Sequence, residues 1–380
     1  MLTTLSPSRL LSLAAAVFLL AVAPAQALET NAREALLVDL ETGTELLAKD
    51  ADAPMPPASM SKIMTAYMVF ERLKDARLSL DDELLVSEKA WRKGGSKMFV
   101  KVGNKVRVED LLRGVIVQSG NDACIVLAEA ISGTEEAFAQ EMTRRAREIG
   151  LKNSNFANAT GWPDPNHWMT ARDLAILAKR IIEDFPEYYP YYAETEFTWS
   201  GIRQSNRNPL LYKSVGADGL KTGHTEEAGY GLTASAVQGE RRLVLVLNGL
   251  SSQRKRAEES ARIMAWGFRE FANYKLVAAG EELDQATVWL GEDDTVPLVA
   301  SQDLTVTLSR AARANMKVKV VYDSPIPAPI QAGDVVARLV VEAPNSKAVE
   351  IPLEAGQDVE LLGVFGRLAA ALKALIFGTS

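Results

Sequence analysis

Two residues near the N-terminal end of the sequence, Ser59 and Lys62, have the types and spacing needed for acyl transfer. Residues three positions apart on a helix share one face, so the hydroxyl and the amine can meet. A serine hydroxyl is a weak nucleophile until a base removes its proton. Lysine can act as that base where apolar surroundings and the first turn of a helix lower its pKa. Alone the pair predicts little, because many surface helices contain S-x-x-K by chance.

A second candidate cluster, Ser119-Gly120-Asn121, lies between two predicted helices. The Asn121 amide can hydrogen-bond a peptide carbonyl of a substrate, and Ser119 can relay protons near Lys62. The alternative interpretation is an ordinary turn, because Ser, Gly and Asn are common turn residues.

The third cluster, Lys221-Thr222-Gly223, lies on a predicted strand. Lys221 adds positive charge that helps to keep Lys62 neutral and attracts a carboxylate. Gly223 allows a substrate backbone to approach closely, and an edge strand can pair with an extended peptide. This cluster too has no predictive value by itself.

The elements that must position these residues follow from periodicity and turn signals. Residues 35–48 are typical of a hairpin, and an apolar helix is predicted from Ser59 to Leu73. The pattern is mostly helical from 108 to 185. Three strands and a helix are then predicted, at 218–222, 230–236, 242–247 and 260–274. Strands at both ends with helices between them indicate one sheet flanked by helices. Short alternating runs between 283 and 353 predict a small all-β domain.

Length and composition limit the possible classes. A chain of 380 residues favours two domains, and a net charge of −7 gives the protein as a whole no electrostatic reason to bind nucleic acid. The single cysteine, Cys124, excludes an intramolecular disulfide and is expected to be a small buried apolar residue. The two histidines, His167 and His224, lie in no G-x-S-x-G context, and H-E-x-x-H is absent. His167 is expected in a loop.

Both ends of the chain carry apolar segments. Residues 1–27 are typical of a signal peptide, with cleavage after Ala25-Gln26-Ala27 and a mature chain that begins at Leu28; a membrane anchor is the alternative. Residues 361–377 form a helical pattern with a broad apolar face and two charges, Arg367 and Lys373. This pattern favours a helix that lies in a membrane interface. The alternatives are packing on the β domain or on a partner.

In this order, the three clusters resemble those of penicillin-binding proteins and serine β-lactamases. The whole mature chain is most similar to the low-molecular-mass penicillin-binding proteins that are D-alanyl-D-alanine carboxypeptidases. The segments that carry this resemblance are SGNDAC at 119–124, DGLKTGH at 218–224, NRN at 206–208 and WGF at 266–268.

The resemblance implies an α/β (α+β) fold of the serine β-lactamase/transpeptidase type. A five-stranded antiparallel sheet would be flanked by helices and followed by a small all-β C-terminal domain. The expected divisions are a signal peptide at 1–27, the carboxypeptidase domain at 28–276, the β domain at 277–355 and an amphipathic membrane-anchoring helix at 358–380.

The resemblance also implies a role for each site residue. Ser59 is the acylated nucleophile, Lys62 is the general base for acylation, and Ser119 and Asn121 line the cleft. The residues expected to bind the substrate, with its terminal carboxylate, are Asn121, Lys221, Thr222, Gly223, His224, Arg256 and Arg207. Backbone N–H groups of Ser59 and His224 would form the oxyanion hole. Two alternatives stay open: His224 acts through its backbone only, or Arg256 is a solvated helix residue.

The implied activity is removal of the terminal D-Ala from peptidoglycan stem peptides, with inhibition by β-lactams and with no metal or cofactor. The protein would be periplasmic and attached peripherally to the inner membrane. A β-lactamase is the first alternative, but class A enzymes carry S-D-N and a Glu-x-x-Leu-Asn segment that this sequence lacks. An endopeptidase, a transpeptidase and a non-catalytic wall-binding or penicillin-sensing protein are the others.

Overall fold

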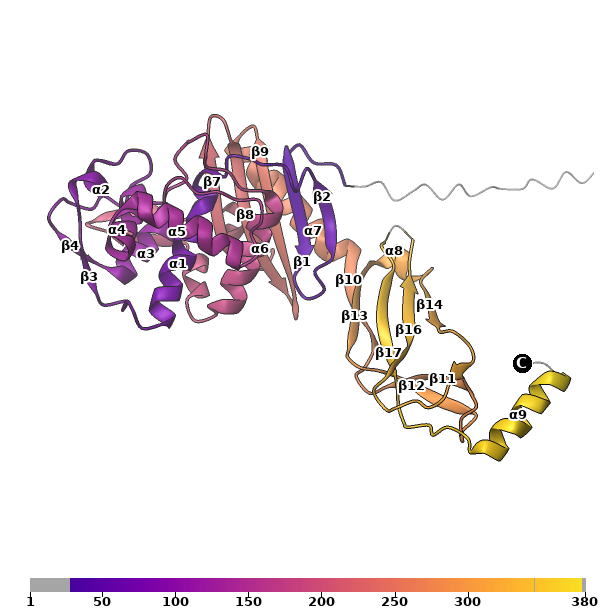
Figure 1. Cartoon of the computed structure of the whole chain (residues 1–380). Helices are drawn as coiled ribbons and strands as arrows, with labels where there is room; N and C mark the ends of the chain where they lie inside the picture. The colour runs from indigo at the N-terminus through magenta and orange to yellow at the C-terminus, as the bar shows by residue number, and fades with distance from the viewer. Residues whose placement is uncertain (1–27, 345, 378–380) are drawn as a thin grey trace, which may run out of the picture.

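The structure, a computed structural model, describes residues 28–344 and 346–377, so the predicted signal peptide lies outside the described residues. The chain forms an elongated molecule with two units (Figure 1). A unit of helices and one large sheet occupies one end, a β unit follows, and helix α9 (Val364–Phe377) lies at the other end.

The large sheet is built from both ends of the first unit, as predicted. Its five strands are all antiparallel to their neighbours and have the order β2-β1-β9-β8-β7. They are β1 (Glu34–Asp39), β2 (Glu45–Lys49), β7 (Ala217–Thr225), β8 (Gly229–Gln238) and β9 (Arg241–Leu250). Helix α6 (Ala171–Asp184) packs on β1 and β9, and α7 (Gln253–Glu270) packs on β8 and β9. Strand β7 is at one edge of this sheet.

The helical part of the first unit surrounds α1 (Lys62–Lys74), which continues the short 3₁₀ helix η1 (Ala58–Ser61). Apolar residues occupy most sides of α1, so nearly all of the helix is buried and the predicted helix from Ser59 to Leu73 is confirmed. The surrounding elements are α2 (Glu88–Arg92), α3 (Val108–Ile116), α4 (Asn121–Ser132), α5 (Glu135–Glu148), η2 (Tyr189–Ala193), η3 (Pro209–Tyr212) and the hairpins β3 (Glu83–Leu85) with β4 (Lys105–Arg107) and β5 (Glu196–Trp199) with β6 (Ile202–Ser205).

The helix predicted at 260–274 is wrong at both ends. Helix α7 begins seven residues earlier, at Gln253, where the Ser252 hydroxyl accepts a hydrogen bond from the N–H of Lys255. It ends at Glu270, because the chain then becomes strand β10 (Phe271–Val277), which pairs with β13 (Leu304–Ser309). Helical periodicity continued past the end of the helix, and the partner strand is too distant in sequence to be anticipated.

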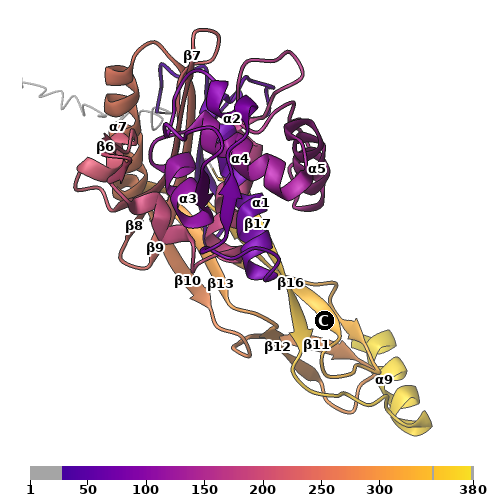
Figure 2. The same ribbon diagram turned by 90° about the vertical axis from the view of Figure 1, so that its left-hand side faces the viewer.

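The second unit is mainly β structure, as predicted. Figure 2 shows it as a narrow extension below the helical unit. Its strands are β10, β11 (Glu282–Trp289), β12 (Thr295–Ala300), β13, β14 (Lys317–Val321), β15 (Ile326–Pro327), β16 (Val335–Glu342) and β17 (Val349–Ala355), with one short helix, α8 (Arg310–Arg313). Among the described residues, its apolar core shares no residue with the cores of the first unit.

The junction between the units is largely polar. Asn273 on β10 donates hydrogen bonds to Asp39 (3.2 Å) and Glu41 (2.6 Å), and the hydroxyls of Thr42 and Thr307 are 2.5 Å apart. Asp39 and Thr307 are buried, so these hydrogen bonds are shielded from water and stabilise the junction.

Helix α9 has little contact with the rest of the protein at its start. The side chains of Phe365 and Leu368 are 88% and 65% exposed. In the part of the chain that the structure describes, no helix is long and apolar enough to cross a membrane.

Candidate active site

Ser59 lies in η1, which packs against strand β7 with unusually little space between the two backbones. A Cβ atom on Gly223 of β7 would lie 2.7 Å from the carbonyl oxygen of Pro57. Gly161 has a φ of +74°, and a Cβ there would lie 1.9 Å from the Ala58 carbonyl oxygen. Glycine is therefore required at both positions. These close contacts fix the turn that carries Ser59.

Lys62, the first residue of α1, is almost completely buried and directs its amine at Ser59. Its Nζ donates hydrogen bonds to Ser59 Oγ (2.8 Å), Asn121 Oδ1 (2.8 Å) and the carbonyl oxygen of Thr160 (2.5 Å). Burial lowers the pKa of Lys62 to about 8, and the positive charge of Arg207 adds to this shift. A substantial fraction of this lysine is therefore neutral under mildly alkaline conditions.

A second buried lysine, Lys221 on β7, faces the opposite side of the cleft. Its Nζ donates to Ser119 Oγ (3.0 Å) and to the carbonyl oxygen of Thr222 (3.1 Å). Burial, and then the charge of Lys62, hold the pKa of Lys221 well below its usual value. Ser119 has a φ of +60°, a left-handed conformation that is unusual for a residue with a Cβ. Such local strain is typical of functional sites.

Asn121, at the start of α4, joins the lysine to a surface loop. Its Oδ1 accepts from Lys62, while its Nδ2 donates to the carbonyl oxygen of Gly94 (2.9 Å) and its N–H donates to that of Ser96 (2.8 Å). The buried Asp122 carboxylate accepts from the N–H groups of residues 98–100 at 2.8 to 3.2 Å. Adjacent residues of α4 thus hold both parts of this loop against the cleft.

Two arginines and two rings form one end of the cleft. Arg207 donates to the hydroxyl of Ser96 (2.7 Å), and Arg256 lies over the ring of Tyr230 at 5.7 Å. The imidazole ring of His224 lies against the same Tyr230 ring, with centroids 3.9 Å apart and an interplanar angle of 32°. Burial lowers the pKa of both arginines, that of Arg256 to about 10. Two cations in a partly desolvated position suit a carboxylate ligand.

The structure brings all ten predicted site residues together. Seven of them line a cleft of about 290 Å³, namely Ser59, Ser119, Arg207, Thr222, Gly223, His224 and Arg256. The other three, Lys62, Asn121 and Lys221, are hydrogen-bonded at its base. Sequence reasoning missed Ser96, Thr160 and Asp122. Of these three, only Asp122 could have been recognised from the sequence, because it directly follows the second cluster.

The two remaining candidate residues, Cys124 and His167, do not line the cleft. Cys124 is buried as predicted, and burial raises the pKa of its thiol to about 12. His167 is a buried loop residue whose Nδ1 accepts from the N–H of Ala157, and burial lowers its pKa to about 4. Among the described residues, no group of three or more His, Cys, Asp or Glu side chains could hold a metal ion.

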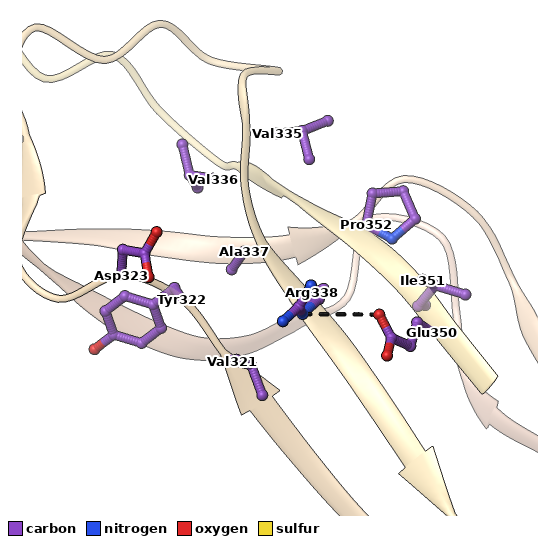
Figure 3. Close-up of a pocket in the computed structure, with 10 residues that line it drawn as sticks. All are labelled: Val321, Tyr322, Asp323, Val335, Val336, Ala337, Arg338, Glu350, Ile351 and Pro352. Atoms are coloured by element: carbon purple, nitrogen blue, oxygen red, sulfur yellow. Dashed lines mark ion pairs between the residues drawn. The ribbon is translucent and has the colours of Figure 1, made fainter. Parts of the chain in front are cut away.

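A hollow on the β unit differs from the cleft in the chemistry of its lining residues. It has a volume of about 470 Å³ between β14, β16 and β17 and contains Tyr322, Asp323, Arg338 and Glu350 (Figure 3). Arg338 and Glu350 lie 3.7 Å apart as an ion pair. The residues that line it include no serine, cysteine, lysine or histidine, so this hollow offers no nucleophile or base of the Ser-Lys type.

A serine hydroxyl bonded to a buried lysine, beside an edge strand of an antiparallel sheet, defines the class of Ser-Lys acyl-transfer enzymes. Comparison with known proteins agrees. Residues 21–251 match the D-alanyl-D-alanine carboxypeptidase family, and residues 271–361 match the C-terminal domain of penicillin-binding protein 5. This chain belongs to the D-alanyl-D-alanine carboxypeptidase family. The predicted family, fold class and enzyme class, a serine-type peptidase, are confirmed.

Individual relatives cover most of the chain. D-alanyl-D-alanine carboxypeptidase DacC of Escherichia coli is 40% identical over 90% of this chain and 88% of its own length. The crystal structure of DacD from Francisella tularensis has a TM-score of 0.81 and 31% identity, covering 88% of this chain and 95% of its own. Penicillin-binding protein D2 of Listeria monocytogenes in its ampicillin-bound form has a TM-score of 0.59 and 30% identity, covering 63% and 98%.

Proposed function

We propose that this protein removes the terminal D-Ala from peptidoglycan stem peptides through an acyl-enzyme on Ser59. The observation that carries the proposal is the 2.8 Å hydrogen bond between Ser59 and the buried Lys62, whose pKa is lowered to about 8. Within the described residues Lys62 makes no ion pair with a carboxylate, and its three hydrogen-bond acceptors are neutral oxygens. A buried lysine of this kind is suited to act as a general base.

Acylation begins when neutral Lys62 takes the proton of Ser59 Oγ. The oxygen attacks the carbonyl carbon of the penultimate D-Ala, and the negative charge on the carbonyl oxygen is stabilised by the N–H groups of Ser59 and His224. The C–N bond then breaks. The proton held by Lys62 passes to the leaving amine through Ser119 Oγ, which leaves Lys62 neutral again, and Lys221, 3.0 Å from Ser119 Oγ, orients that hydroxyl.

The substrate is held as an extended peptide beside edge strand β7. Thr222 and the guanidinium groups of Arg207 and Arg256 take the free terminal carboxylate, which supplies the negative charge that the two cations lack. Asn121 positions both Lys62 and the substrate amide. Gly223 lets β7 lie close to η1, which places Ser59 beside the strand.

Water then attacks the acyl-enzyme, releasing the shortened peptide and regenerating Ser59. A β-lactam carries a reactive carbonyl and a carboxylate that fit the same groups, and it therefore acylates Ser59. The ampicillin-bound form of the Listeria monocytogenes relative supports this proposal.

We also propose that the catalytic unit comprises residues 28–276, the β domain residues 277–355, and an anchoring segment residues 358–380, after removal of a signal peptide at 1–27. In this division β10 (Phe271–Val277) is the connecting strand, which leaves the catalytic unit and pairs with β13. The exposed Phe365 and Leu368 of α9 would enter the interface of the inner membrane on its periplasmic side. The β domain would then separate the cleft from the membrane.

The deciding experiment measures release of D-Ala from a peptide that ends in Lys-D-Ala-D-Ala, together with labelling by fluorescent penicillin. The wild type and a Ser214→Ala control, altered at an exposed loop serine, are expected to release D-Ala and to be labelled. Ser59→Ala is expected to do neither. Labelling of Ser59→Ala would refute the assignment, and rapid nitrocefin hydrolysis without D-Ala release would indicate a β-lactamase.

A further inference from the structure

The segment 88–107, which includes α2 and β4, concentrates positive charge beside the cleft. It contains seven Lys or Arg residues and one acidic residue, Glu88, although the chain as a whole has a net charge of −7. Charge of one sign in so short a segment produces a local field opposite to that of the protein.

Three of these seven cations are already neutralised by neighbours. Lys89 pairs with Glu135 and Glu136, Arg92 with Glu88, and Arg107 with Asp81 and Glu109. The other four have no carboxylate within 4.0 Å in the part of the chain that the structure covers. We call them the lysine surface: Lys93, Lys97, Lys101 and Lys105.

Exposed apolar side chains accompany the lysine surface. Trp91, Phe99 and Trp162 are 42%, 46% and 43% exposed, and Lys93 Nζ lies 4.5 Å from the Trp162 ring centroid. Phe99 has a φ of +70°, and the Asp122 carboxylate accepts its N–H, so the ring is held outward by a conformation that a side chain rarely adopts. Large aromatic faces beside cations suit a ligand that has both flat and anionic parts.

Two residues of the lysine surface, Lys93 and Lys97, adjoin the cleft. Ser96, between Lys93 and Lys97, lines the cleft, and Asn121 binds the carbonyl oxygens of Gly94 and Ser96. In Figure 1 the elements that carry it, α2 and β4, lie at the end of the molecule remote from α9. A polymer whose peptide enters the cleft can therefore extend over this surface.

We propose that the lysine surface binds the anionic glycan-peptide polymer that carries the substrate, as a second contact outside the cleft. This inference rests on the proposed function. Neighbouring stem peptides of such a polymer bear free carboxylates, which complement the unpaired lysines, and its sugar rings provide faces for Trp91 and Phe99. Anionic lipid is the other available polyanion, but the position opposite α9 favours the polymer.

The test uses Lys101→Gln/Lys105→Gln in the full-length protein, because both lysines are exposed and lie outside the catalytic machinery. Lys152→Gln/Lys213→Gln, which removes two exposed lysines elsewhere on the same unit, is the matched control. Three quantities are measured at low and at high salt: co-sedimentation with purified insoluble peptidoglycan, co-sedimentation with phosphatidylglycerol vesicles, and D-Ala release from polymer and from a short peptide.

The Lys101→Gln/Lys105→Gln variant is expected to bind peptidoglycan about three- to ten-fold more weakly than the control at low salt. Its D-Ala release from polymer is expected to fall in parallel, and its turnover of the short peptide is expected to stay unchanged. High salt should remove the difference, because exposed charges are screened. Equal peptidoglycan binding by the two variants, or a loss confined to vesicle binding, would overturn the proposal. Failure of the proposed function would appear separately, as absence of short-peptide turnover in the wild type.

Discussion

The amine of Lys62 donates a 2.8 Å hydrogen bond to the hydroxyl of Ser59, and the lysine is almost wholly buried. The amine makes two further hydrogen bonds, both to neutral oxygens. Neutral acceptors satisfy a buried ammonium without stabilising its charge as a carboxylate would. The base is therefore positioned by groups that leave its pKa low.

This relationship predicts a pH dependence. Because Lys62 must be neutral to accept the proton, and its pKa is about 8, the rate of acylation by penicillin should rise about tenfold per pH unit below the pKa and level off above it. Stopped-flow labelling between pH 6 and 10 measures this. Lys62→Met should abolish the reaction at every pH, whereas Lys74→Met, at an exposed position of the same helix, should keep the profile. A flat profile in the wild type would contradict Lys62 as the base.

Gly223→Ala should damage the cleft without altering any functional side chain. The added Cβ would lie 2.7 Å from the Pro57 carbonyl oxygen, so η1 must move away from β7 and carry Ser59 with it. A displacement of this size should lower kcat/KM for D-Ala release by about 100-fold. Gly363→Ala, where a Cβ meets no atom within 4 Å, is the control. Normal activity of Gly223→Ala would show that the contact is unimportant.

Asp122→Asn should loosen the loop that borders the cleft. The carboxylate accepts the backbone N–H groups of loop residues 98–100 and that of Ala123, and an amide presents a donor to at least one of them. We expect a loss of about 1–3 kcal/mol in the free energy of unfolding, and slower penicillin acylation. Denaturant unfolding and labelling kinetics test this against Asp75→Asn, an exposed carboxylate. Unchanged stability would mean that other contacts hold the loop.

Removal of α9 should release the protein from membranes. Truncation after Glu360, or Phe365→Ser with Leu368→Ser, removes the exposed apolar side chains that are proposed to enter the interface. Fractionation should move both variants from the membrane pellet to the supernatant while D-Ala release from a short peptide is retained. Continued pelleting of both variants would refute attachment through this helix.

Much of the site could be predicted from the sequence because each cluster lies where a periodic pattern changes. Ser59 begins a core helix, Ser119 lies between two helices, and Lys221 follows the return to strands. Contacts between residues that are far apart in the sequence could not be predicted. Thr160 supplies an acceptor to Lys62 from 98 residues away, through a loop with no periodicity.

The same limit explains the errors in the fold. Strand β10 is recognisable only through its partner β13, which follows it by about thirty residues. The lysine surface escaped notice because a global charge of −7 conceals a local excess of cations.

The polar junction around Asn273 and Thr42 has a consequence for where the enzyme can act on the wall. Asp39 and Thr307 are 0% and 5% exposed, so the hydrogen bonds of the junction are shielded from water and hold the two units at a set angle. Under the proposed attachment, the catalytic unit would act at one height above the membrane, set by the length of the β domain. A single anchored molecule would then reach newly made wall only by moving with its anchor in the plane of the membrane.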